Sequence, residues 1–197
     1  MTIPSSAGPR NTSSTRCKPG FSDRPPWIKT PCIASESLSA AAGCQVFAKL
    51  DLLQPSGSFK IRGVGNMIWQ TVQRFADPSR PLHFYSSSRG NAGLAAATAA
   101  KRLGQKATVV VPEMTAVKMM ARIEAAGAEV IEHGVSLSEA DECARALAAA
   151  REDAAYVPPF DHELIWEGKW TWSRYCQHLH LLSRHLYQNF EEGLLRH

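Results

Sequence analysis

The sequence has no hydrophobic run long enough to cross a membrane and no cysteine pattern typical of a structural scaffold. No stretch approaches the ~18 consecutive apolar residues that a membrane-spanning helix requires, and the first residues lack the apolar block of a secretory signal. The five cysteines are odd in number and widely spaced, with no CxxC pair, which argues against a disulfide framework and a zinc knuckle. We therefore expect a cytoplasmic chain with free thiols and no membrane partner.

The central part of the sequence also lacks a strong excess of either charge. The formal net charge is +4 over 197 residues, but the basic excess lies at the two ends, in residues 1–26 and 169–197. The nearly neutral middle offers no electrostatic surface for nucleic acid. We expect no nucleic-acid partner.

The composition of the first 26 residues predicts a disordered arm. Fifteen of these 26 residues are Ser, Thr, Pro or Gly, so the segment cannot bury enough apolar surface to offset the entropy of ordering it. Its Ser, Arg and Lys content is also typical of a mitochondrial presequence. Five prolines oppose the amphipathic helix that such a signal needs, so a mitochondrial location is the less favoured alternative.

Residues 27–168 alternate short strand-like runs with helix-period runs, which is typical of parallel βα units. This pattern predicts an α/β fold with a parallel sheet. The predicted strands are residues 44–50, 82–86, 107–111, 129–132 and 155–157. The predicted helices are residues 58–72, 91–103 and 116–126, and a fourth that begins after a capping box formed by Ser136 and Glu139.

Residues 169–197 interrupt the alternation of strands and helices. Four of the seven histidines lie here, but one HxH pattern is too weak a signal to predict a metal site. We interpret the segment as a divergent tail outside the folded region.

Lys60 stands in a turn-rich stretch, QPSGSFKIRG (residues 54–63), which delivers a lysine to the start of a predicted helix beside Phe59. A nucleophilic lysine must be partly desolvated so that its amine is available near neutral pH, and a helix N-terminus disfavours the ammonium form in the same direction. Taken alone, Lys60 is better explained as an exposed lysine of the first helical turn.

A second unusual stretch, SSSRGNAG (residues 86–93), lies where a predicted strand meets an Ala-rich helix. Hydroxyl groups, the permissive Gly90 and free backbone N–H groups at a helix start are suited to binding a carboxylate or a phosphate. An N-cap turn without a ligand explains the same residues equally well. Because parallel strands end at one edge of a sheet, we expect this turn and Lys60 to converge there.

The two motifs together, PSGSFKIRG followed by SSxGNAG, resemble the pyridoxal phosphate enzymes of fold type II. The resemblance is strongest to the branch of L-serine dehydratases and L-threonine deaminases, and Ala92 after the Asn fits that branch. It extends over residues 27–168. It implies a tryptophan synthase β-like fold, of which this chain holds the small domain and the start of the large domain.

The resemblance also implies an activity and residue roles. The implied reaction is deamination of L-serine, or of L-threonine, in which β-elimination of the hydroxyl group is followed by hydrolysis to ammonia and pyruvate or 2-oxobutanoate. The resemblance also implies a homodimer, in a lyase of amino-acid metabolism. Lys60 would form the Schiff base with pyridoxal 5′-phosphate, Phe59 would pack on the pyridine ring, and Asn91 would bond to the ring oxygen. The implied substrate-binding residues are Ser58, Ser88, Gly90 and Asn91.

Two features depart from this family. Arg89 occupies a position where the family has a small residue, and we hypothesise that it impairs turnover. After Gly168 the family continues with a glycine-rich loop for the cofactor phosphate, and residues 169–197 offer no substitute. We expect a chain truncated relative to the family, and the alternative to a catalytic protein is a non-catalytic fragment or an interaction module.

Overall fold

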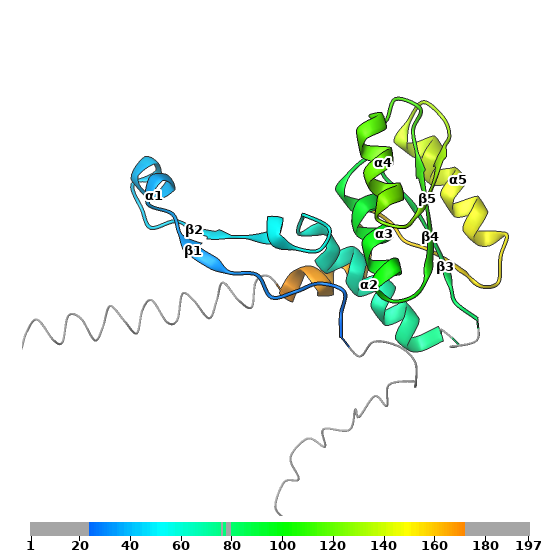
Figure 1. Ribbon diagram of the computed structural model, residues 1–197, viewed down its shortest axis with the longest axis horizontal. Helices are drawn as coiled ribbons and strands as arrows, with labels where there is room; N and C mark the ends of the chain where they lie inside the picture. Colours follow the sequence, from blue (N-terminus) through cyan, green and yellow to red (C-terminus); the bar gives the residue numbers. More distant parts are fainter. Residues whose placement is uncertain (1–23, 76, 78–79, 172–197) are drawn as a thin grey trace, which may run out of the picture.

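The computed structural model describes residues 24–75, 77 and 80–171 of the chain (Figure 1). The body of the molecule is a four-stranded sheet with helices on both faces, and a smaller arm projects from it. Among the described residues, no helix is long and apolar enough to cross a membrane. The elements of the body are α2 (Lys60–Phe75), β3 (His83–Ser87), α3 (Asn91–Arg102), β4 (Lys106–Val111), α4 (Val117–Ala125), β5 (Glu129–Glu132), α5 (Leu137–Ala149) and β6 (Ala154–Tyr156).

The sheet of the body has the strand order β5-β4-β3-β6, and all of its strands are parallel. Helix α3 packs on β3 and β4, with α2 and α4 beside it, and α5 covers the other face (Figure 1). The predicted α/β fold with a parallel sheet is confirmed. The predicted strands 82–86, 107–111, 129–132 and 155–157 correspond to β3, β4, β5 and β6 within one residue at each end.

Strand β4 lies in the centre of the core because helices cover it on both sides. Val109, Val110 and Val111 are fully buried, as expected for a strand of a parallel sheet that is covered on both faces. The alanines of α3 allow the helix to lie close to the strands, and Gly93 marks the closest approach. A Cβ added at Gly93 would meet Val109 Cγ1 at 2.8 Å and the Ser88 carbonyl oxygen at 3.0 Å.

The capping box at the start of α5 is present. The Ser136 hydroxyl accepts a hydrogen bond from the Glu139 backbone N–H at 3.2 Å and donates to the Glu139 carboxylate at 2.9 Å. The same carboxylate accepts from the Val135 N–H at 3.0 Å. These bonds satisfy donors that a helix start otherwise leaves without an intrahelical partner.

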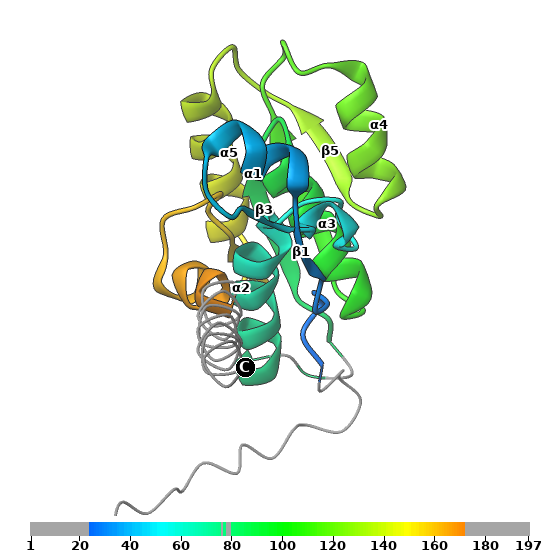
Figure 2. The same ribbon diagram turned by 90° about the vertical axis from the view of Figure 1, so that its left-hand side faces the viewer.

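The prediction that residues 44–50 form the first strand of the parallel sheet is wrong. Only β2 (Phe47–Lys49) forms there, and it pairs antiparallel with β1 (Cys32–Ala34) in a separate two-stranded sheet. The short helices α1 (Glu36–Ala42) and η1 (Asp51–Leu53) complete this arm, which reaches out from the body (Figures 1 and 2). The apolar run in residues 44–50 predicts a strand but not its partner, because strand pairing depends on packing with distant parts of the chain.

The two predicted boundaries of the folded region, after Pro26 and after Gly168, both lie at residues that pack against α2. Pro26, placed at the end of the disordered arm, is buried, and its Cγ lies 2.9 Å from a Cβ added at Gly65 of α2. Gly168, placed before the divergent tail, lies within a helical segment over residues 163–171 that packs against α2. Residues 1–23 and 172–197, with Cys17, Cys176 and the tail histidines, lie outside the described residues.

Candidate functional site

Lys60 is the first residue of α2, and its side chain is held by the loop that follows β6. Its Nζ donates a hydrogen bond to the Pro159 carbonyl oxygen at 3.2 Å. The same Nζ lies 5.8 Å from the ring centroid of Phe59 and 5.3 Å from that of Phe160. The amine is therefore fixed between two aromatic rings and one backbone carbonyl, over a sequence separation of 99 residues.

The surroundings of Lys60 favour its neutral amine. Burial lowers the pKa of Lys60 below its ordinary value, and the positive charge of Lys169 lowers it further. The described residues provide no ion pair between Lys60 and a carboxylate that would oppose this shift. A lowered pKa leaves a larger fraction of neutral amine near neutral pH, which is the form that attacks a carbonyl carbon.

The turn before α2 has a polar atom without a partner. Ser58 is 8% exposed, and its hydroxyl has no hydrogen-bond partner within the described structure. Gly57 precedes it with φ +72°, a conformation in which glycine carries no Cβ penalty. A buried hydroxyl without a partner costs free energy, so this atom is suited to accept or donate to a bound group.

The second predicted site, residues 88–91, forms the turn between β3 and α3. The Gly90 N–H donates to the Ser88 hydroxyl at 3.2 Å, and Gly90 is the N-cap of α3. No side chain caps this helix, and the space where a Cβ of Gly90 would stand is open. Asn91 is exposed at the first helical position. The first turn of α3 thus has backbone N–H groups that no side chain caps, as an anion-binding turn requires.

The two parts of the site lie on loops that are joined at the carboxyl edge of the sheet. The Ser86 hydroxyl donates to the Val157 carbonyl oxygen at 2.8 Å, and the Val157 N–H donates to the Tyr85 carbonyl oxygen at 2.7 Å. These bonds fix the loop after β6, which holds Lys60, against the end of β3, which leads into the Ser88 turn. In the described structure, however, no hydrogen bond connects Lys60 directly to that turn.

On the face of the sheet that α5 covers, the carboxylate of Asp141 connects the ends of β3 and β6. Asp141 of α5 accepts hydrogen bonds from the hydroxyls of Ser87 and Tyr156, the last residues of β3 and β6. Arg145 donates to the same carboxylate at 2.7 Å. Burial and the adjacent Asp141 raise the pKa of Tyr156 to about 12, so this hydroxyl stays protonated as a donor.

A buried ion pair fixes the first turn of α2 to the arm. Arg62 Nε and Nη2 donate to the two Asp51 carboxylate oxygens at 2.8 Å each. The Thr30 hydroxyl also donates to Asp51, at 2.6 Å. Burial opposes ionisation of Asp51, but the hydrogen bonds from Arg62 and Thr30 outweigh it and lower the pKa to about 2. Asp51 is therefore charged at neutral pH.

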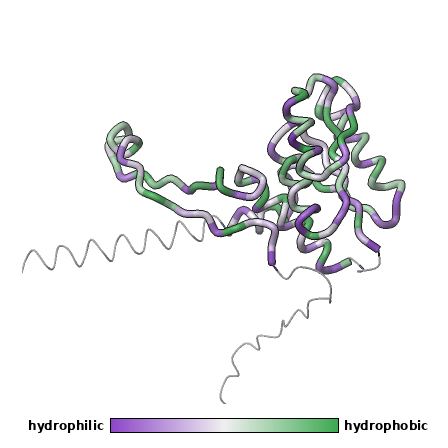
Figure 3. The backbone as a smooth tube through the Cα atoms, viewed as in Figure 1, coloured by the Kyte–Doolittle hydropathy of each residue, from purple (hydrophilic) through white to green (hydrophobic). Residues whose placement is uncertain are grey.

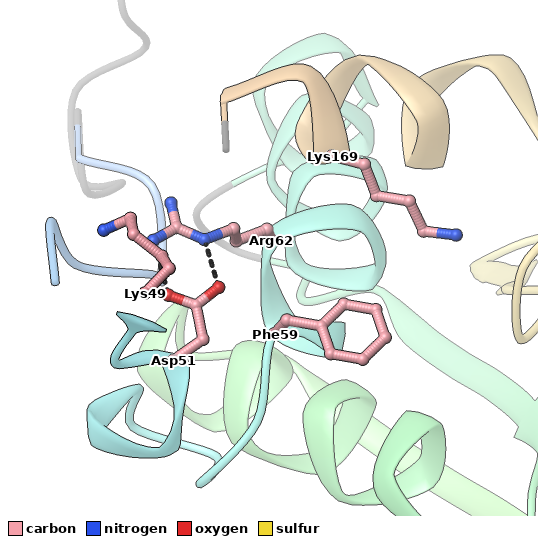
Figure 4. A pocket seen from close by; sticks show the side chains of 5 residues that line it. All are labelled: Lys49, Asp51, Phe59, Arg62 and Lys169. Carbon is pink, nitrogen blue, oxygen red and sulfur yellow. Dashed lines mark hydrogen bonds and ion pairs between the residues drawn. The ribbon is translucent and has the colours of Figure 1, made fainter. Parts of the chain in front are cut away.

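A cavity of about 440 Å³ opens beside this ion pair (Figure 4). Phe59 lies on its wall, so the ring that flanks the Lys60 amine also faces the cavity. The lining residues are Lys49, Asp51, Phe59, Arg62 and Lys169.

The structure thus brings Phe59, Lys60 and the neighbouring Ser58 to one end of α2, and Ser88, Gly90 and Asn91 to the start of α3. Three residues without a predicted role also contact or face this region, namely Pro159, Phe160 and Lys169. The sequence PPF at residues 158–160 could have indicated Pro159 and Phe160 as site residues, because it follows closely after a predicted strand, at the edge of the sheet where a site is expected. The described residues contain no cluster suited to a metal ion.

The fold and these loops define the class of protein. Residues 24–175 match the model of the family of pyridoxal-phosphate dependent enzymes, and the chain belongs to that family. The resemblance stated from the two motifs is therefore confirmed, as is the fold type. The family model extends past Gly168, where we predicted that the family fold ends.

Two curated relatives and one solved structure indicate which branch of the family the chain resembles. The chain is 48% identical over 148 residues to the human L-serine dehydratase/L-threonine deaminase, covering 75% of this chain and 44% of that protein. It is 43% identical over 149 residues to the L-serine dehydratase of Saccharomyces cerevisiae, covering 73% and 44%. A fungal L-serine ammonia-lyase from Rhizomucor miehei superposes with a TM-score of 0.65 at 34% identity, covering 74% and 44%.

A pyridoxal 5′-phosphate-dependent aspartate racemase superposes equally well, with a TM-score of 0.65 at 32% identity, covering 74% of this chain and 44% of that one. Proteins that carry out different reactions therefore share this architecture. The chain spans 44% of the length of the human relative.

Proposed function

We propose that the protein takes part in pyridoxal phosphate-dependent deamination of L-serine or L-threonine, with Lys60 as the reactive amine. The observation that carries this proposal is the placement of Lys60. Its Nζ is fixed by the Pro159 carbonyl between two aromatic rings, with a lowered pKa. The similarity to L-serine dehydratases from human and yeast supports the substrate class.

The residues present fit the aldehyde and the ring of the cofactor. Lys60 has an amine for the aldehyde carbon, Phe59 has a ring for the pyridine face, and Asn91 has an amide group at the accessible start of α3. The Ser58 hydroxyl, buried without a partner, is a further polar contact for a bound group. When bound, pyridoxal phosphate supplies an electron sink for the α-carbon of an amino acid.

The chain's own groups then perform three tasks. The N–H groups at the uncapped start of α3 bind the substrate carboxylate, and the Ser88 hydroxyl holds that turn in place through the Gly90 N–H. The Lys60 amine, once free, accepts the proton that leaves the α-carbon, and burial, which lowers the pKa of Lys60, favours the neutral form that a base needs. The Pro159 carbonyl orients the resulting ammonium through a hydrogen bond.

The test is reductive trapping of the cofactor on the full 197-residue chain. Incubation with pyridoxal phosphate and borohydride, followed by peptide mass mapping, should place the label on Lys60. The Lys60→Ala variant should lose it, and Lys106→Ala, an exposed lysine at the start of β4, should retain it. Pyruvate formation from L-serine by the wild-type chain, absent in Lys60→Ala, completes the test. Label on other lysines but not on Lys60 contradicts the proposal.

We propose in addition that the protein forms a homodimer through the arm. Five large apolar side chains there are 42–68% exposed, and the arm stands away from the body (Figures 1 and 3). These residues are Ile33, Leu38, Phe47, Leu52 and Leu53. Exposed apolar surface favours association. Light scattering on the chain and on a Phe47→Glu variant tests this, since the variant should shift the mass to that of a monomer.

The same surface supports the second candidate function, a non-catalytic interaction module. Association without label on Lys60 and without pyruvate formation favours this candidate over the enzyme. For either function we propose a cytoplasmic location, which fractionation of cells that express the tagged protein tests. Recovery in the mitochondrial fraction would contradict it.

A further inference from the structure

The carboxylate of Asp141 on α5 binds the ends of two strands at once. Its Oδ1 accepts a hydrogen bond from the Ser87 hydroxyl at 2.5 Å and another from the Tyr156 hydroxyl. Its Oδ2 accepts from Arg145 Nε at 2.7 Å, one helical turn further along α5. Ser87 is fully buried, and the Asp141 side chain is 25% exposed. One carboxylate oxygen therefore connects β3 with β6, while the other binds a cation at the surface.

The two strands that Asp141 connects are of unequal length at this edge of the sheet. In the register of the sheet, Tyr85 of β3 lies opposite Tyr156, the last residue of β6. Strand β3 continues for two more residues, Ser86 and Ser87. The Tyr156 side chain spans this offset, because its hydroxyl and that of Ser87 meet on the same carboxylate oxygen. Side-chain bonds thus continue the connection between the strands past the end of β6.

Each of these strand ends leads directly into one half of the candidate site. Ser87 precedes the turn at the start of α3, to which we assign the substrate carboxylate. Tyr156 precedes the loop whose Pro159 carbonyl oxygen accepts a hydrogen bond from Lys60 Nζ at 3.2 Å. Asp141 therefore joins the residue before the substrate turn to the residue before the loop that binds the reactive amine.

A second bond joins the same two loops, but it is neutral. The Ser86 hydroxyl donates to the Val157 carbonyl oxygen at 2.8 Å, on the face away from α5, because successive strand residues point to opposite faces. Burial opposes ionisation of Asp141, but the hydrogen bonds from Ser87 and Tyr156 outweigh it and lower the pKa below its ordinary value. Bonds to a carboxylate are stronger than neutral ones. Asp141 therefore makes the stronger connection.

The packing of α5 on the sheet has a separate basis. Ala140 and Ala144 are fully buried against Val110 of β4, and helix α5 covers this face of the sheet (Figure 1). The Ser136 and Glu139 capping box fixes the start of the helix. Loss of the Asp141 carboxylate should therefore leave the helix in place and change only the contacts at the strand ends.

We propose that Asp141 is a positioning residue that holds the substrate turn before α3 and the loop that binds Lys60 in one fixed relation. This inference rests on the proposed function. Asp141 touches neither substrate nor cofactor in this role, and it acts through the hydroxyls of Ser87 and Tyr156. Without the carboxylate, the turn and the loop move independently, and the group that binds the substrate loses its alignment with the group that accepts the proton.

Hydrogen exchange on the 197-residue chain without cofactor tests this relation independently of the reaction. In Asp141→Ala, peptides covering residues 84–94 and 154–161 should exchange about tenfold faster, because hydrogen bonds to a charged group are lost. A peptide covering residues 117–125 of α4 should exchange as in the wild type. Arg145→Ala is the matched control, since it removes the exposed ion pair but keeps both hydroxyl contacts, and it should stay within about twofold of the wild type.

A conservative variant adds a graded result. Asp141→Asn keeps one oxygen that accepts from the hydroxyls but loses the charge. Its exchange in the two segments should therefore lie between that of the wild type and that of Asp141→Ala.

Steady-state kinetics with L-serine and saturating pyridoxal phosphate separates positioning from loss of folded protein. Ser87→Ala loosens the substrate turn and should raise KM about tenfold, with a smaller change in kcat. Tyr156→Phe loosens the loop that binds Lys60 and should lower kcat, with a smaller change in KM. A fold that is merely less stable lowers kcat in proportion to the unfolded fraction and leaves KM unchanged.

Unchanged exchange in both segments of Asp141→Ala overturns the proposal, as does faster exchange of all segments alike, α4 included. Reductive trapping distinguishes this failure from failure of the proposed function. Label on Lys60 in the wild type, with unchanged exchange in Asp141→Ala, refutes only the positioning role. Faster exchange confined to the two segments, without label on Lys60 in the wild type, refutes the proposed function and leaves Asp141 as the connection between the loops.

Discussion

Arg62 and Asp51 form a two-pronged buried ion pair that joins the first turn of α2 to the arm. The two bonds measure 2.8 Å each, and the residues are 1% and 8% exposed. Because Lys60 lies two residues before Arg62, this pair anchors the turn that carries the Lys60 amine. It connects the arm, where Thr30 also bonds to Asp51, to the candidate site.

Removing one partner of this pair should destabilise the fold strongly. Asp51→Ala leaves the Arg62 guanidinium buried without a counter-charge, and we expect a loss of about 3–5 kcal/mol in the free energy of unfolding. Arg62→Lys should also destabilise, because an ammonium cannot make the two parallel bonds. Urea unfolding followed by circular dichroism measures both. Equal stability of Asp51→Ala and the wild type would contradict the assigned role.

The same pair predicts a specific acid sensitivity. The pKa of Asp51 is about 2 in the folded protein and 3.8 in its ordinary state. A carboxyl whose pKa is lowered by folding stabilises the fold above its unfolded pKa, and this contribution is lost as the pH falls from about 4 to about 2. The free energy of unfolding should therefore decrease over that range. The decrease should be smaller in Asp51→Asn, which has no carboxyl to titrate.

The cluster around Asp141 predicts a late titration of Tyr156. Burial and the negative charge of Asp141 raise the tyrosine pKa to about 12. In Asp141→Asn the charge is absent, so the pKa of Tyr156 should fall toward 10 while burial keeps it above that value. Nuclear magnetic resonance of ring-labelled tyrosine follows the titration, with Tyr156→Phe identifying the signal. A pKa that does not move in Asp141→Asn would refute the coupling.

Gly168 should tolerate no side chain. A Cβ there would collide with the Arg62 carbonyl oxygen of α2, which is backbone and cannot rotate away. We expect Gly168→Ala to lower the free energy of unfolding by about 1–3 kcal/mol, the usual cost of overpacking. Glu163→Ala, at an exposed position of the same helical segment, is the control and should change the stability by less than about 0.5 kcal/mol. Thermal unfolding of both variants decides between these outcomes.

Arg89 should limit the rate if the protein deaminates serine. It is exposed and lies between Ser88 and Gly90, in the turn that we assign to the substrate carboxylate. A guanidinium beside that carboxylate competes with the N–H groups of α3 for it. Arg89→Gly should therefore raise kcat for pyruvate formation. An unchanged rate would show that the side chain points away from the substrate.

Some of this protein could be predicted from its sequence because the signals are local. Strands β3 to β6 follow from runs of apolar residues between turn residues, and the cap of α5 follows from Ser136 and Glu139 three positions apart. The motifs around Lys60 and Asn91 identified the family. These features depend on neighbours within a few positions, which the sequence displays directly.

Other features were decided only by the tertiary structure. Strand β2 joins β1 and not the parallel sheet, and Lys60 contacts a carbonyl 99 residues away. Pro26 and Gly168 both pack on α2, and Lys169 faces the same cavity as Asp51. Such contacts form when helices and loops from distant parts of the chain bury surface against each other. Close packing selects these partners, and no local periodicity in the sequence records that choice.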